Sequence, residues 1–136
     1  MRVVILGCGR VGSGLAERLA AEGHQVAVVE QDREAFSRLS SNFPGLLVVG
    51  VGIDEDVLRR AGIEEADAFV AAAPDDNMNI MAAQVAKEIF HVPRIIARVF
   101  DPLRQEIYQS LGLDTISSTA LAVEFMHKAL MARGRA

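Results

Sequence analysis

The sequence predicts an α/β fold in which six parallel strands form a doubly wound sheet, in the strand order 3-2-1-4-5-6. Short apolar runs alternate with helical patterns along the chain, and this alternation favours a parallel sheet with helices on both faces. Right-handed crossovers make the order 3-2-1-4-5-6 the natural choice. A chain of 136 residues is enough for one domain with a hydrophobic core and too short for two. We therefore expect a single domain over residues 1–136.

Composition and charge narrow the class of protein. Hydrophobic residues make up 51% of the chain and the net charge is −4, so we expect neither disorder nor nucleic-acid binding. A single cysteine excludes an internal disulfide. No apolar run approaches the roughly 18 residues of a membrane span. Because Met1 leads straight into an apolar run, we expect no signal peptide and a cytoplasmic protein.

The first thirty residues have the order strand, glycine loop, helix, strand, acid. The apolar run Val3–Leu6 precedes the loop Gly7–Gly12, and a helical pattern runs from Val11 to about Ala21. A second apolar run, Val26–Val29, ends at Glu30. This is the order of a dinucleotide-binding βαβ unit of the Rossmann type. The alternative is a Rossmann-like fold whose loop is only a tight turn and binds nothing.

Each residue of this motif has a physical reason to be there. Gly7 permits the tight turn, Gly9 allows a pyrophosphate to approach the backbone, and Gly12 allows the helix to pack closely on the strand. The helix N-terminus offers N–H groups and a positive dipole end to phosphates. Glu30 follows Gly12 by 18 residues, so its carboxylate is expected to accept from ribose hydroxyls and to repel a 2′-phosphate. The motif indicates NAD(H) or an adenine nucleotide rather than NADP(H).

Two other loop residues have competing interpretations. The guanidinium of Arg10 is placed to fold over a phosphate and bind it bidentately, or else it is a solvated side chain at the start of a helix. Cys8 lies at a helix N-terminus, where the pKa of a thiol is lowered. It has no second cysteine or histidine near it in sequence, so we interpret it as a small filler.

The remaining elements follow from apolar periodicity, helix caps, and glycine or proline stops. Further strands are expected over residues 46–49, 68–73, 94–99 and 113–116. Further helices are expected over residues 33–41, 55–61, 75–90, 103–111 and 118–132. We expect strand 46–49 to be buried. Helix 75–90 is apolar almost all round, which predicts packing against more than one neighbour. The strand order reverses between the first and fourth strands, which places a ligand in that crevice.

Eight short motifs are spread along the chain. They are Gly7–Gly12, Val29–Asp32, Asp56–Leu58, Ala61–Ile63, Ala66–Ala68, Pro74–Asn79, Ile96–Val99 and Leu111–Asp114. Together they resemble the N-terminal nucleotide-binding lobe of RCK domains (regulators of potassium conductance), also called TrkA-N or KTN. The resemblance includes an arginine, Arg10, inside the glycine loop.

The resemblance implies a regulatory cytoplasmic subunit or domain that binds NAD(H), ATP, ADP or AMP. The ligand would gate potassium transport by changing the conformation of a partner in the membrane, so the chain would lie peripherally at the inner face. The implied phosphate-binding residues are Gly7, Cys8, Gly9, Arg10, Val11 and Gly12. The implied ribose and crevice residues are Glu30, Gln31, Asp32, Gly50, Val51, Gly52, Ala72, Ala73 and Arg98.

Two departures from the family pattern stand out. The family usually has Gly-Asp after the third strand, with the Asp beside the adenine, whereas this chain has Gly50-Val51-Gly52. An acceptor for the adenine amino group is therefore missing. The second, C-terminal ligand-binding lobe of the family is also missing from the sequence, which represents either a stand-alone lobe or part of a longer protein.

The last helix, residues 118–132, is rich in apolar side chains. These are Leu121, Val123, Phe125, Met126, Leu130 and Met131. The resemblance implies that this helix crosses over to a neighbouring lobe, which predicts a homodimer through the C-terminal helix, within a larger ring when the full system assembles. The alternative is that the helix packs on its own domain.

An enzyme is the alternative function, namely a fragment of an NAD-dependent oxidoreductase. About 20 residues remain after the sixth strand, which leaves no substrate domain. Tyr108 has Gly112 rather than a lysine four residues later, and the three histidines are scattered. No metal-ligand spacing occurs. We therefore expect no enzymatic activity; a third possibility is an interaction protein that has lost its ligand.

Overall fold

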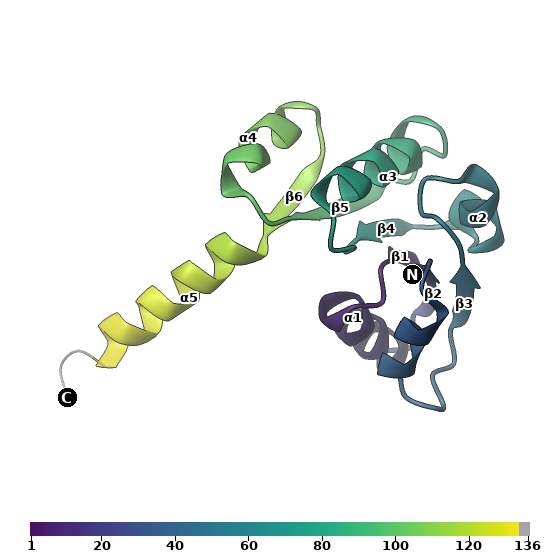
Figure 1. Ribbon diagram of the computed structural model, residues 1–136, viewed down its shortest axis with the longest axis horizontal. Helices are drawn as coiled ribbons and strands as arrows, with labels where there is room; N and C mark the ends of the chain where they lie inside the picture. The colour runs from purple at the N-terminus through teal and green to yellow at the C-terminus, as the bar shows by residue number, and fades with distance from the viewer. Residues whose placement is uncertain (134–136) are drawn as a thin grey trace.

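The structure, a computed structural model that describes residues 1–133, contains one sheet of six parallel strands. The strands are β1 (Arg2–Leu6), β2 (Gln25–Glu30), β3 (Leu46–Val49), β4 (Ala68–Ala71), β5 (Arg94–Val99) and β6 (Asp114–Ser117). Their order across the sheet is β3-β2-β1-β4-β5-β6 (Figure 1). The predicted doubly wound α/β fold and its strand order are confirmed.

The helices begin where the sequence supplies caps. They are α1 (Arg10–Ala21), α2 (Glu55–Arg60), α3 (Asp76–Glu88), α4 (Pro102–Ser110) and α5 (Ser118–Arg133), with the short 3-10 helices η1 (Arg33–Arg38) and η2 (Ile63–Glu65). The carboxylates of Asp54, Asp75 and Asp101 accept backbone N–H bonds in the first turns of α2, α3 and α4. Such caps satisfy donors that have no partner inside the helix.

Alternation along β1 builds a core on each face of the sheet. Val4 and Leu6 pack with residues of α2 and α3, whereas Val3 and Ile5 pack with residues of α1 and η1. Successive side chains of a strand point to opposite faces, so one apolar run serves both cores. In Figure 1, α1 and η1 lie on one side of the sheet and α2 and α3 on the other. No helix in the part of the chain the structure describes has the length and apolarity needed to span a bilayer.

Two expectations about burial and length are wrong. Strand β3 is an edge strand, and Leu46, Leu47 and Val49 are 51%, 42% and 36% exposed, because β2 is its one neighbour. Helix α3 contacts both β4 and β5, as the expectation of more than one neighbour requires, although Met81 is 50% exposed. The helix expected over residues 33–41 is a 3-10 helix that ends at Arg38.

The short length of η1 has a local cause. The backbone N–H and hydroxyl of Ser40 both donate to the carboxylate of Glu17 on α1. Leu39 is already extended, with φ −81° and ψ 151°, so the chain leaves the helix before Ser40. The contact joins residues 23 positions apart, which no local pattern of the sequence records.

Helix α5 extends away from the rest of the molecule (Figure 1). Its apolar side chains are exposed, from 41% at Leu121 to 68% at Leu130. The two hydrophobic cores contain no residue beyond Leu113 among the residues the structure describes. The alternative that this helix packs on its own domain is therefore wrong.

Candidate functional site

A cleft of about 480 Å³ lies at the carboxyl ends of the strands, at the point where the strand order reverses. Ligands of open α/β sheets bind at such switch points. The predicted residues that line this cleft are Gly7, Gly9, Arg10, Glu30, Gln31, Asp32, Gly50, Gly52, Ala72, Ala73 and Arg98. Eleven of the fifteen predicted site residues therefore line one cleft.

Four other predicted site residues do not line the cleft. Cys8 and Gly12 are buried, and Val11 and Val51 expose 46% and 40% of their surface elsewhere. Burial raises the pKa of the Cys8 thiol, and the negative charge of Glu30 raises it further. The thiol is thus a protonated, buried filler, and Cys8 acts in the site through its backbone N–H.

The glycine loop brings the chain very close to β4. Gly7 has φ +103°, and a Cβ there would lie 2.8 Å from backbone atoms of Ala72 and Ala73. At Gly12 a Cβ would collide with the carbonyl oxygen of Gly7. At Gly9, by contrast, no described atom lies within 4 Å of the position a Cβ would take. The loop is therefore packed at Gly7 and Gly12 and open to the cleft at Gly9, which suits the approach of a phosphate.

The start of α1 faces this open position. Gly9 is the residue before the helix, and no side chain among residues 1–133 caps the first turn. The first N–H groups of a helix without a cap are free to bind an anion, and the helix dipole adds to the attraction. Arg10 follows at the first position of α1, where its exposed side chain lines the cleft.

Glu30 joins the end of β2 to the glycine loop. Its Oε1 accepts from the N–H of Cys8 at 2.9 Å, and its Oε2 accepts from the N–H of Asp32 at 3.0 Å. A carboxylate has about four acceptor sites, so each oxygen retains capacity for a ligand hydroxyl. The two backbone bonds fix the orientation of the carboxylate at the cleft.

Asn79 joins the ends of β4 and β5. This buried amide of α3 accepts from the N–H of Ala73 at 2.8 Å through Oδ1, and its Nδ2 donates to the carbonyls of Ala73 and Arg98 at 2.8 and 2.9 Å. The N–H and carbonyl of Ala73 both bond to Asn79 and not to a neighbouring strand. Strand β4 therefore ends at Ala71 instead of the predicted residue 73. The sequence contained Asn79 in a family motif but did not indicate this role.

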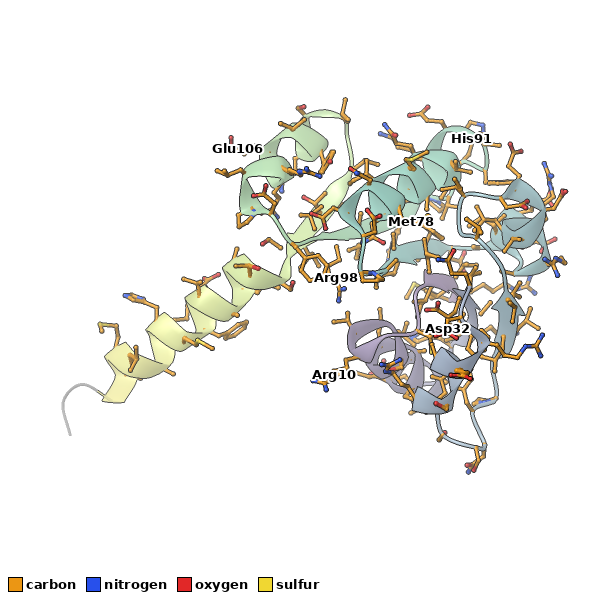
Figure 2. All side chains as sticks on the ribbon, viewed as in Figure 1. Arg10, Asp32, Met78, His91, Arg98 and Glu106 are labelled. Carbon is orange, nitrogen blue, oxygen red and sulfur yellow. The ribbon has the colours of Figure 1, made fainter. Side chains whose placement is uncertain are left out.

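Arg98 extends from β5 toward the glycine-loop side of the molecule (Figure 2). Its Nη2 donates to the Ala73 carbonyl at 3.3 Å, and the guanidinium lies 4.5 Å from the centre of the Phe100 ring. Burial lowers the pKa of Arg98, and the charge of Asp76 opposes this shift. The Nε is buried and has no hydrogen-bond partner in the part of the chain described, and the side chain lines the cleft.

Six residues that line the cleft were not predicted from the sequence. They are Leu6, Ala35, Arg38, Pro74, Asp75 and Met78. Pro74, Asp75 and Met78 follow β4, and their place at the carboxyl edge of the sheet was a usable signal. Arg38 follows Ala35 by three residues, a spacing that keeps two residues on one face of an α-helix as well, so this residue also had a usable signal. In a 3-10 helix residues three apart share a face, so Arg38 lies on the same side as Ala35.

The segment after β3 lacks an acid. Gly50 and Gly52 line the cleft, and a Cβ at Gly52 would collide with the side chain of Leu6. The second glycine is therefore a steric requirement of the chain passing over Leu6. Neither it nor Val51 supplies the adenine acceptor that the resemblance leads one to expect at this place.

Comparison with known protein families matches the TrkA-N domain over residues 3–119. The chain belongs to the TrkA-N family. This confirms the resemblance in the sequence. The TrkA-N chain is 49% identical over 134 residues to the Trk system potassium uptake protein TrkA of Streptomyces coelicolor, a match covering 98% of this chain. The chain spans about 60% of the length of that relative.

Solved structures share the fold at low sequence identity. The Kef CTD of Shewanella denitrificans in its AMP-bound form is 23% identical, with a TM-score of 0.82, over 98% of this chain and 82% of that one. The RCK domain of GsuK is 22% identical, with a TM-score of 0.78, over 98% and 30%. The GsuK channel bound to NAD is 22% identical, with a TM-score of 0.71, over 85% and 21%.

We predict that Asn79→Ala lowers the free energy of unfolding by about 2–4 kcal/mol, because three hydrogen bonds are lost and buried backbone groups lose their partner. Urea unfolding at one protein concentration measures the change. The control is Asn77→Ala, which removes an exposed amide of the same helix and is expected to change stability by about 0.5 kcal/mol or less. Equal losses in the two variants would contradict the role of Asn79.

Proposed function

We propose that this TrkA-N chain is the nucleotide-binding regulatory lobe of a potassium uptake system. The observation that supports this most strongly is the cleft, in which an open glycine position, an uncapped helix start and a pre-oriented carboxylate occur together. Relatives named as potassium uptake proteins and folds solved with AMP or NAD add support. The ligand in this proposal is NAD(H) or an adenine nucleotide.

The roles of the residues follow from their positions. The phosphates lie against Gly9 and the start of α1, with Arg10 over them, and Glu30 accepts from the adenosine ribose. Arg98 presents its guanidinium from the opposite wall. Residues 1–136 form one lobe in this proposal. The lobe lies in the cytoplasm at the inner face of the membrane and transmits the bound state to a membrane-embedded potassium channel or transporter subunit.

An oxidoreductase fragment has less support. Within residues 1–133, the cleft lining contains no histidine, lysine, tyrosine or cysteine side chain. Its acids are Glu30, Asp32 and Asp75, and the carboxylate of each accepts a backbone N–H bond. Among residues 1–133, the cleft thus offers these carboxylates no histidine or lysine partner for acid–base catalysis. We therefore propose a binding site rather than a catalytic one.

The exposed α5 supplies the surface for assembly. We propose that the TrkA-N chain forms a homodimer through this helix, within a larger ring when the whole system assembles. Burying a side chain such as Phe125 contributes about 1.5–3 kcal/mol. Several such residues per chain suffice for a dimer, and a two-fold axis brings the same face of both copies together.

The first prediction concerns Glu30. Isothermal titration calorimetry is expected to show NADH binding more tightly than NADPH, because the Glu30 carboxylate accepts from ribose hydroxyls and repels a 2′-phosphate. Glu30→Ala is expected to weaken the binding of NADH by about 1–3 kcal/mol, because the ribose hydroxyls lose their acceptor. Glu34→Ala, an exposed acid outside the cleft, serves as the control. NADPH binding as tightly as NADH would make this role wrong.

The second prediction concerns Arg10. If its guanidinium binds the terminal phosphate, Arg10→Ala weakens ATP more than AMP, by roughly tenfold, because only ATP places charge there. Arg18→Ala removes an arginine from the last turn of the same helix and is expected to weaken both nucleotides equally. Competition binding with a fluorescent nucleotide measures the ratio. If Arg10→Ala weakens the binding of ATP and AMP equally, Arg10 is a solvated side chain and does not bind the terminal phosphate.

The third prediction concerns assembly. The unmutated chain is expected to be a dimer in light scattering, and Leu121→Glu with Phe125→Glu is expected to give a folded monomer that still binds nucleotide. The monomer keeps its fold because the cores do not include α5. Gln84→Glu with Gln109→Glu adds the same charge at exposed positions outside α5 and should leave the dimer intact. A monomeric unmutated chain at high concentration would refute the proposal.

A further inference from the structure

The charges that line the cleft differ in how they are engaged. The acids are occupied locally: Glu30 accepts from two backbone N–H groups, Asp32 from the N–H of Glu34 at 3.1 Å, and Asp75 from the N–H of Asn77 at 2.8 Å. Two of the three arginines that line the cleft have no such partner in the described part of the chain. Within residues 1–133, Arg10 and Arg38 line the cleft without a side-chain hydrogen bond or ion pair. Arginine donors without a partner favour an anionic ligand.

Arg38 lies at the ribose end of this cleft. It lines the cleft together with Glu30 and Ala35, and the 3-10 geometry of η1 places it on the face that Ala35 presents to the cleft. Its positive charge lowers the pKa of the Cys8 thiol, against the larger effect of burial. Because the N–H of Cys8 donates to Glu30, the guanidinium and the carboxylate belong to the same end of the cleft.

We propose that Arg38 is a specificity-determining residue that donates to a phosphate on the adenosine ribose and so offsets the repulsion by Glu30. This inference rests on the proposed nucleotide-binding function. The choice between NAD(H) and NADP(H) is then set by the pair Glu30 and Arg38 instead of the acid alone. NADP(H) is disfavoured by the carboxylate but not excluded.

The chemistry of Glu30 and Arg38 supports opposing effects on a phosphate attached to the ribose. A guanidinium binds phosphate bidentately, and an arginine near the ribose accommodates the 2′-phosphate of NADP in folds of this kind. Arg38 is exposed, so it can turn toward a ligand without breaking a bond in the protein. The phosphates attached to the 5′ carbon have a separate group of donors in this proposal, at the open Gly9 position and the uncapped start of α1.

The test compares two ligands that differ by one phosphate, 5′-AMP and adenosine 2′,5′-bisphosphate, in titration calorimetry. Arg38→Ala is expected to weaken the bisphosphate roughly tenfold relative to 5′-AMP, and Arg38→Lys is expected to retain part of the preference. Arg33→Ala is the matched control, because Arg33 is an exposed arginine of the same 3-10 helix outside the cleft lining. The control should leave the ratio of the two dissociation constants within about twofold. Thermal unfolding verifies that each variant is folded.

Three outcomes would overturn the inference. An unchanged ratio in Arg38→Ala means that the guanidinium does not reach the ribose. An equal change of this ratio in Arg33→Ala means that the effect comes from the overall positive charge of η1 and not from a contact made by Arg38. If Arg38→Ala weakens the binding of ADP relative to 5′-AMP as much as it weakens the binding of the bisphosphate, Arg38 contacts the 5′-phosphates instead. If the unmutated chain binds none of these ligands, the proposed function fails as well, which distinguishes that failure from the first three.

Discussion

The amide of Asn79 is the contact on which the rest of the cleft depends. One buried side chain satisfies the N–H and the carbonyl of Ala73 and the carbonyl of Arg98. These groups lie beyond the end of one strand and near the end of the next, where the ladder of the sheet no longer pairs them. A buried polar group whose bonds are all met specifies one arrangement of its neighbours. Asn79 thereby sets the wall from which Arg98 projects.

The opposite wall depends on Glu30, which has two functions. Its carboxylate accepts from Cys8 and Asp32 and so ties β2 to the glycine loop. The same bonds orient the acceptors before any ligand arrives, which reduces the reorganisation that binding requires. The acid that the motif associates with a ribose is thus also part of the loop structure. This explains how a loop of small residues keeps one shape above the sheet.

The TrkA-N lobe keeps its hydrophobic cores separate from the exposed apolar side chains of α5. Neither hydrophobic core includes a described residue beyond Leu113, whereas α5 carries exposed Phe125, Met126 and Leu130. Exposed apolar patches of this kind mark interaction sites. Because β6 leads directly into α5, and β6 pairs with β5 of the cleft wall, the helix is connected through the sheet to the residues around Arg98. The fold thus offers a short physical path from the cleft to the exposed helix.

The sequence by itself determined the order of the elements, the strand β5, the caps of α2 and α3 and the glycine loop, because each depends on residues adjacent in the chain. The direction and burial of side chains were decided by the tertiary structure. The edge position of β3 exposes residues that a purely local pattern places inside, and a bond between Ser40 and Glu17 ends η1 early. Such outcomes depend on contacts between residues far apart in the chain, which the periodicity of a single segment does not contain.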